Sequence, residues 1–224
     1  MKRLLGAISG ACALALATAT SASPTITVSG GNIVYVDAAG GRHALTNSGG
    51  FKEAALSPDG HTVAFIHVDG PATSAADDAP TSLWIADGLK GGARKLIGHH
   101  DASDVKALFM SYGGPVFSLD GGFVYVTAQA WATSGAVHQV SLATGREHFV
   151  IDGGCSAVIR TGPWRGYLLV TRHMYYPAPK YGSYDPTYVV RPDAKQSFIV
   201  PGTDEDDNVD HVTPWLKKNG WQAW

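Results

Sequence analysis

Two stretches of sequence decide the fold: AALSPDG at 54–60 and VFSLDG at 116–121. Each leads into an apolar run, TVAFI at 62–66 or FVYVT at 123–127, and the two Asp-Gly pairs lie 61 residues apart. Asp hydrogen-bonds its own backbone and Gly accepts the left-handed conformation, so each stretch predicts a tight turn between two strands.

A second pattern, in which a Gly turn joins two strands, occurs at 32–46, 83–97 and 137–150. Its second and third copies follow the two Asp-Gly turns. One repeat therefore contains four strands, and repetition at this spacing predicts an all-β protein built from successive four-stranded sheets.

Ser57-Pro58-Asp59-Gly60 and the hairpin of 83–97 resemble the Pro-Asp repeat of TolB-type β-propellers, in which each repeat is one blade. The resemblance is good over 51–97 and fair over 114–152, where Leu119 replaces the Pro. Residues 25–47 resemble half a blade, and 157–200 are expected to form another. The resemblance implies a short member of this family that lacks the N-terminal TolB domain.

The chain length of 224 residues suggests one domain, with 1–22 as a signal peptide, 23–212 as the propeller and 213–224 as a helical tail. The basic Lys2-Arg3 pair, the apolar stretch from Leu4 and the small residues before 22 are typical of an export signal. The 202 residues after it correspond, at about 45 per blade, to about four to five blades, possibly an incomplete ring. A periplasmic or secreted location is expected.

The amino-acid composition narrows the classes of function that this protein can have. Apolar residues make up 45% of the chain, which predicts a folded core, and 17 Lys and Arg against 19 Asp and Glu give a net charge of −2. Without an excess of positive charge, a dedicated nucleic-acid binder is excluded.

After signal cleavage Cys155 is the only cysteine that remains, and its apolar setting predicts a buried structural thiol. A short helix is expected around 214–219, capped by Thr213 and packed on the propeller.

No common catalytic motif is present: the sequence has no Gly-x-Ser-x-Gly, His-Glu-x-x-His, P-loop or Gly-x-Gly-x-x-Gly. This favours a noncatalytic protein, so no catalytic residue is assigned. His99, His100, Asp101 and Asp104 are residue types that bind metals, but a polar loop explains them equally. No metal site or cofactor is predicted, apart from a weak candidate Ca²⁺ site at Asp204, Asp206, Asn208 and Asp210.

The strongest candidate binding site is a segment rich in Tyr. Six of the nine Tyr lie between 167 and 188, and prolines at 177, 179 and 186 prevent one regular strand. Tyr combines a rigid apolar face with a hydroxyl group, which suits binding surfaces. The predicted binding residues are Arg172, His173, Tyr175, Tyr176, Tyr181 and Tyr184.

The interpretation is an exported noncatalytic propeller that binds an envelope protein or an exported ligand, without a membrane span after cleavage. Two alternatives remain. One is a hydrolase or lyase acting on a glycan or peptide, with His100, His173 and nearby carboxylates as acid and base candidates. The other is a lectin-like protein that binds sugar through the Tyr-rich loop.

Overall fold

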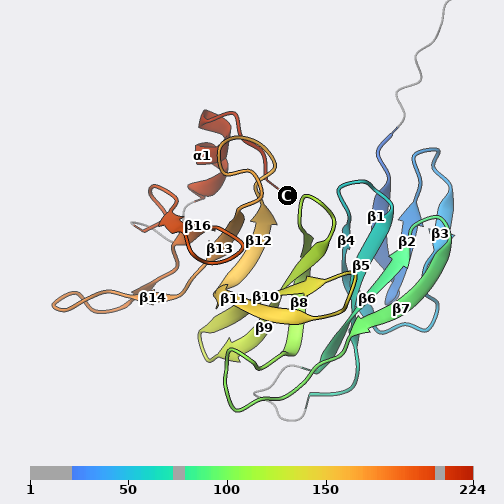
Figure 1. Ribbon diagram of the computed structural model, residues 1–224, viewed down its shortest axis with the longest axis horizontal. Helices are drawn as coiled ribbons and strands as arrows, with labels where there is room; N and C mark the ends of the chain where they lie inside the picture. The colour runs from blue at the N-terminus through green and yellow to red at the C-terminus, as the bar shows by residue number, and fades with distance from the viewer. Residues whose placement is uncertain (1–21, 73–78, 205–209, 224) are drawn as a thin grey trace, which may run out of the picture.

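A computed structural model describes residues 22–72, 79–204 and 210–223 of the chain. Four antiparallel sheets follow one another along the sequence, and a small hairpin projects from the last of them (Figure 1). Over these residues the fold is all-β, as the repeat predicts, and contains one short helix. Within the described ranges, no helix has the length and apolar character needed to cross a membrane.

The first sheet has three strands and each of the other three has four. The first contains β1 (Thr25–Ser29), β2 (Asn32–Val36) and β3 (Arg42–Ala44). The second contains β4 (Phe51–Leu56), β5 (Thr62–Val68), β6 (Thr81–Asp87) and β7 (Gly91–Ile97). The third contains β8 (Met110–Phe117), β9 (Phe123–Trp131), β10 (Ser134–Ser141) and β11 (Glu147–Asp152).

The fourth sheet has the order β12-β13-β16-β17. Its strands are β12 (Gly154–Val158), β13 (Leu168–Thr171), β16 (Thr187–Val190) and β17 (Ser197–Ile199). Between β13 and β16 the chain leaves the sheet to form the hairpin of β14 (Met174–Tyr175) and β15 (Ser183–Tyr184). Residues 69–72 follow β5 and residues 79–80 precede β6.

The two Asp-Gly corners are equivalent in structure. Ser57 Oγ donates to Asp59 Oδ1 at 2.5 Å, and Ser118 Oγ donates to Asp120 Oδ1 at 2.6 Å. In both corners the Ser hydroxyl also accepts the N–H of the first residue of the following strand. The Ser hydrogen bond, followed by a backbone N–H, lowers the pKa of each carboxyl. The corners therefore confirm the repeat.

Successive sheets pack face to face. The strands β1, β4, β8 and β12 contact one another in that order, while the first and fourth sheets lie at opposite ends of the row (Figure 1). Three apolar clusters fill the spaces between neighbouring sheets, around Phe65, Phe109 and Leu168. Each strand alternates its side chains, so it contributes to the layers on both of its faces.

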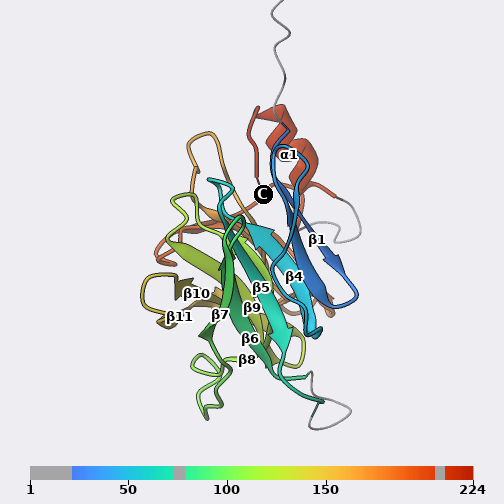
Figure 2. The ribbon, with the colours of Figure 1, turned by 90° about the vertical axis from the view of Figure 1, so that its right-hand side faces the viewer.

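The helix α1 (Val212–Lys218) covers the free face of the fourth sheet. Leu216 packs there against Leu169 and Val189, in a fourth cluster that includes Trp215 and Trp221. The tail packs on the propeller as expected. The helix begins two residues before the expected Pro214, and Asp210 Oδ1, not Thr213, accepts a first-turn N–H. Figure 2 looks at the opposite end, where β1 lies in front of the row.

Candidate functional site

The Tyr-rich segment forms an ordered hairpin. The rings of Tyr176 and Tyr184 stack at 4.4 Å with an interplanar angle of 15°, and Lys180 Nζ lies 3.3 Å from the centre of the Tyr176 ring. These contacts hold the two arms together. Tyr175 and Tyr181 remain 68% and 89% exposed. The hairpin thus uses two tyrosines for its own structure and presents two to solvent.

Ion pairs fix the base of the hairpin. Arg172 forms a bidentate pair with Asp152 of β11, with N–O distances of 2.8–3.0 Å, and its guanidinium lies 4.9 Å from the centre of the Tyr188 ring. His173 Nδ1 lies 2.8 Å from Asp185 Oδ1, and its ring meets Tyr175 edge to face. Bidentate Arg pairs restrict orientation strongly. Arg172 therefore positions the hairpin against the third sheet.

A groove of about 640 Å³ lies between the hairpin and the third sheet. We call this cavity the hairpin groove. Its aromatic walls come from Trp131, Phe149, His173 and Tyr175. Trp131, the last residue of β9, is 38% exposed, and Lys106 Nζ lies 5.7 Å from the centre of the Phe149 ring. An apolar concave surface with few polar groups is typical of a binding site.

The structure divides the predicted binding residues into groups. His173 and Tyr175 line the hairpin groove, whereas Tyr176 and Tyr184 stack on each other and Arg172 supports the hairpin base. Sequence reasoning missed Trp131, Phe149 and Lys106. Trp131 stands between Ala130 and Ala132 in the sequence, and a Trp in such a setting could have indicated a binding surface. Its proximity to the hairpin depends on contacts between sheets.

Two carboxylates, one beside the second sheet and one in the third, each lie close to two histidines. Asp69 lies within 2.7 Å of His67 and 3.3 Å of His99, and Glu147 lies within 2.7 Å of His138 and 3.5 Å of His100. His99 and His100 thus contact different carboxylates. Among the described residues no cluster has the arrangement of a metal site. Asp206 and Asn208 of the candidate Ca²⁺ site lie outside the described part.

The acid and base candidates have separate carboxylate partners. His100 Nε2 pairs with Glu147 of β11, and His173 Nδ1 pairs with Asp185 of the hairpin. Cys155 is buried, and burial raises the pKa of its thiol to about 12. The thiol therefore stays protonated near neutral pH, which is the chemistry of a structural cysteine.

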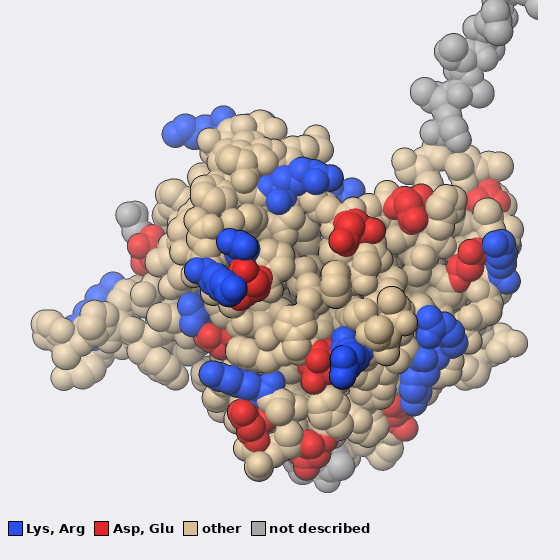
Figure 3. Space-filling view, in the orientation of Figure 1, with Lys and Arg blue, Asp and Glu red and all other residues tan. Residues whose placement is uncertain are grey.

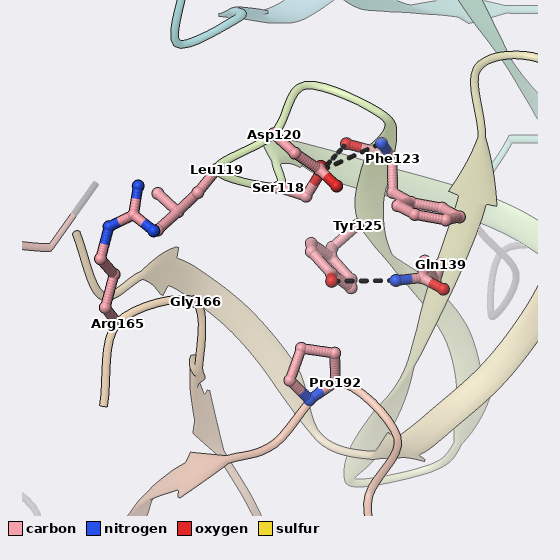
Figure 4. Close-up of a pocket in the computed structure, with 9 residues that line it drawn as sticks. All are labelled: Ser118, Leu119, Asp120, Phe123, Tyr125, Gln139, Arg165, Gly166 and Pro192. Atoms are coloured by element: carbon pink, nitrogen blue, oxygen red, sulfur yellow. Dashed lines mark hydrogen bonds between the residues drawn. The ribbon is translucent and has the colours of Figure 1, made fainter. Parts of the chain in front are cut away.

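A second pocket lies between the third and fourth sheets (Figure 4). Its wall contains Tyr125 and Gln139, and Gln139 Nε2 donates to the Tyr125 hydroxyl at 2.9 Å. Burial raises the pKa of Tyr125 to about 12, so the phenol keeps its proton near neutral pH.

Charged residues of both signs are mixed over the face of the molecule in Figure 3, without a broad area of one sign.

Comparison with known proteins supports the architecture. No protein-family model matches this chain, and no curated protein matches it either. Among solved structures, the chain is similar to the tricorn protease, with 13% identity, a TM-score of 0.55 and coverage of 81% of this chain and 16% of that one. The chain is also similar to dipeptidyl peptidase 4 from Porphyromonas gingivalis, with 9% identity, a TM-score of 0.54 and coverage of 80% of this chain and 31% of that one.

A protein assigned as TolB from Agrobacterium tumefaciens is also similar, with 14% identity, a TM-score of 0.50 and coverage of 75% of this chain and 55% of that one. The chain thus spans from about one sixth to just over half of these three chains. At these identities the similarity establishes the fold alone. The chain has a TolB-like β-propeller fold.

Proposed function

We propose that this protein is an exported, noncatalytic binding protein whose hairpin groove holds an apolar segment of an envelope protein. The observation that carries this proposal is the groove itself, in which Tyr175 of the hairpin and Trp131 of the third sheet supply exposed aromatic surface to one cavity. Aromatic side chains of this kind contribute much of the binding energy at protein interfaces.

The rigidity of the hairpin supports this function. The Arg172–Asp152 pair and the Tyr176–Tyr184 stack hold the hairpin in place without a partner. A surface that is already ordered loses little conformational entropy when a partner binds, which increases affinity. The polar groups that line the groove, among them Lys106, Ser134 and Asp152, suit the backbone and polar side chains of a peptide.

The location of the partner is part of the proposal. The export signal expected at 1–22 lies almost wholly outside the described residues. A TolB-like fold supports an envelope role. Determining the N-terminus of the protein recovered from the periplasm tests the export step, and a start near Ser23 is expected.

Photo-crosslinking tests the groove directly. A photoreactive amino acid at Ala132, which lines the groove, is expected to crosslink one defined partner in cells. The matched control is Leu89, which is 52% exposed on the turn between β6 and β7. The same partner captured from both positions, or none from Ala132, would contradict the proposal.

The purified partner then allows a quantitative test. Trp131→Ala and Tyr175→Ala are each expected to raise the Kd at least about tenfold, because each removes an aromatic anchor. Leu89→Ala should bind like the parent protein. Circular dichroism and the unfolding temperature of each variant show whether the fold is intact. An unchanged Kd in both aromatic variants would exclude the hairpin groove.

A further inference from the structure

The pocket in Figure 4 shares no lining residue with the hairpin groove, so its role is a separate question. It has a volume of about 390 Å³, which is within the usual range for small-ligand sites. Strands β9 and β10 form one wall, and Arg165, Gly166 and Pro192 of the fourth sheet's loops lie across from them.

The repeat shows that this wall is unusual. Tyr125 lies directly opposite Gln139 in the pairing of β9 with β10. The residue 61 positions before Tyr125 is Ala64, which lies opposite Ile85 in the pairing of β5 with β6. The second sheet therefore has an apolar pair where the third has a polar one. Tyr125 and Gln139 are only 2% and 8% exposed, and burying polar groups is costly unless they are hydrogen-bonded.

Their mutual hydrogen bond does not satisfy both side chains. Gln139 Nε2 donates to the Tyr125 oxygen, which leaves the phenolic proton and the Gln139 carbonyl oxygen to bond elsewhere. Within the described part of the chain, neither has a further side-chain or backbone partner. The wall therefore presents one donor and one acceptor, side by side, to a ligand.

The rim of the pocket adds a second donor and a second acceptor. Asp120 Oδ1 accepts from Ser118 and Gly122, and its other oxygen accepts no hydrogen bond from another residue in the described part of the chain. Among the described residues, Arg165 forms no ion pair, and Figure 4 shows it on the far side of Leu119 from Asp120. Asp120 and Arg165 carry opposite charges. One of the two therefore repels any ligand that carries a single charge, whichever its sign. A neutral ligand meets neither penalty.

We infer that this pocket binds one neutral monosaccharide unit. Each sugar hydroxyl both donates and accepts, which matches the alternating donors and acceptors of Tyr125, Gln139, Asp120 and Arg165. The ring of Phe123 supplies an apolar surface for the C–H face of the sugar. This site lies at the seam of the third and fourth sheets and not in the Tyr-rich hairpin.

The test uses calorimetry and ligand-observed NMR with D-glucose, D-galactose and N-acetyl-D-glucosamine. At least one is expected to bind saturably to the full chain at a stoichiometry of one. The double variant Tyr125→Phe/Gln139→Leu restores the apolar character of the repeat and should weaken binding at least about tenfold. If that variant does not fold, Tyr125→Phe alone and the exposed Arg165→Gln are each expected to weaken binding severalfold.

A matched pair of variants separates binding from folding. Asp120→Asn and Asp59→Asn alter equivalent corners and should change stability similarly, but only Asp120→Asn should weaken sugar binding. Binding of none of the three sugars would overturn the inference, as would equal binding by the parent and the folded Tyr125 and Arg165 variants. Tighter binding of a zwitterionic dipeptide such as Gly-Phe would also overturn it. None of these outcomes bears on partner binding in the hairpin groove.

Discussion

His138 is a buried imidazole between two sheets. Its side chain is fully buried, Nδ1 lies 2.7 Å from Glu147 Oε2, and Nε2 has no hydrogen-bond partner among the described residues. The rings of Phe109 and Phe149 lie 5.0 and 5.9 Å away. Desolvation is the largest effect and lowers the pKa of His138, although Glu147 opposes it and His100 and His148 add to it. The imidazole is therefore neutral at pH 7.

This shift makes stability depend on pH. Because the unfolded chain binds a proton at the ordinary pKa of His and folded His138 does not, the free energy of unfolding should fall as the pH drops through about 6.5. The slope from this group is at most about 1.4 kcal/mol per pH unit. Urea denaturation between pH 7.5 and 5 should show a shallower dependence for His138→Gln than for the parent protein. Exposed His61→Gln serves as control, and an identical profile for His138→Gln and the parent protein would contradict the assignment.

Tyr112 links the second and third sheets by both its backbone and its side chain. Its hydroxyl accepts from the Leu83 N–H at 2.9 Å and donates to the Ile97 carbonyl at 3.0 Å. Its own N–H and carbonyl bond to the Thr81 hydroxyl. The ring is fully buried and stacks on Phe109 at 4.1 Å. A single residue thus satisfies polar groups at the seam between two sheets.

Removing the Tyr112 hydroxyl should expose that role. Tyr112→Phe leaves the Leu83 N–H and the Ile97 carbonyl without this partner, which should cost about 1–3 kcal/mol of unfolding free energy. In Tyr167→Phe the lost hydrogen bond to Gln196 is exposed, so the change should stay within about 0.5 kcal/mol. Chemical denaturation measures both. Equal losses in the two variants would show that the Tyr112 hydroxyl has no special role.

At the scale of elements, α1 acts as a cover for the fourth sheet. Leu216 is 4% exposed and packs on the face of the sheet that points away from the third one. Leu216→Ala should therefore lower the free energy of unfolding by about 2–5 kcal/mol, through lost burial and the cavity left behind. Lys217→Ala, on the exposed side of the same turn, should change it by less than about 0.5 kcal/mol. Thermal unfolding of both variants measures these changes. Similar losses of stability in the two variants would argue against the role of α1 as a cover of the fourth sheet.

The elements that sequence could predict are those governed by local chemistry. The corners at Asp59 and Asp120 depend on a Ser, an Asp and a Gly within a few residues, and both were predictable from the sequence. The groove around Trp131 and the polar pair of Tyr125 and Gln139 depend on strand register and on the packing of different sheets. No local pattern specifies that packing, so the sequence predicted the Tyr-rich segment without its aromatic partners.

On the scale of the whole molecule, the two ends of the row differ. The fourth sheet is covered by α1, whereas the first has only three strands and packs on the second through Ile33 and Tyr35. Strand alternation places Val34 and Val36 on its other face, where both are half-buried. In arrays of stacked repeats, each unit is stabilised mainly by its neighbours, so a terminal unit without a cover is the least stable.

Hydrogen exchange can measure this asymmetry. The strands β2 and β13 are a matched pair, because each is hydrogen-bonded to a strand on both sides. The first sheet should open locally without global unfolding, so amides of β2 should exchange faster than those of β13. Mass spectrometry of peptides covering 32–36 and 168–171, across a time series at constant pH, gives the comparison. Equal or stronger protection of β2 would mean that a further surface covers the first sheet in solution, from this chain or from another molecule.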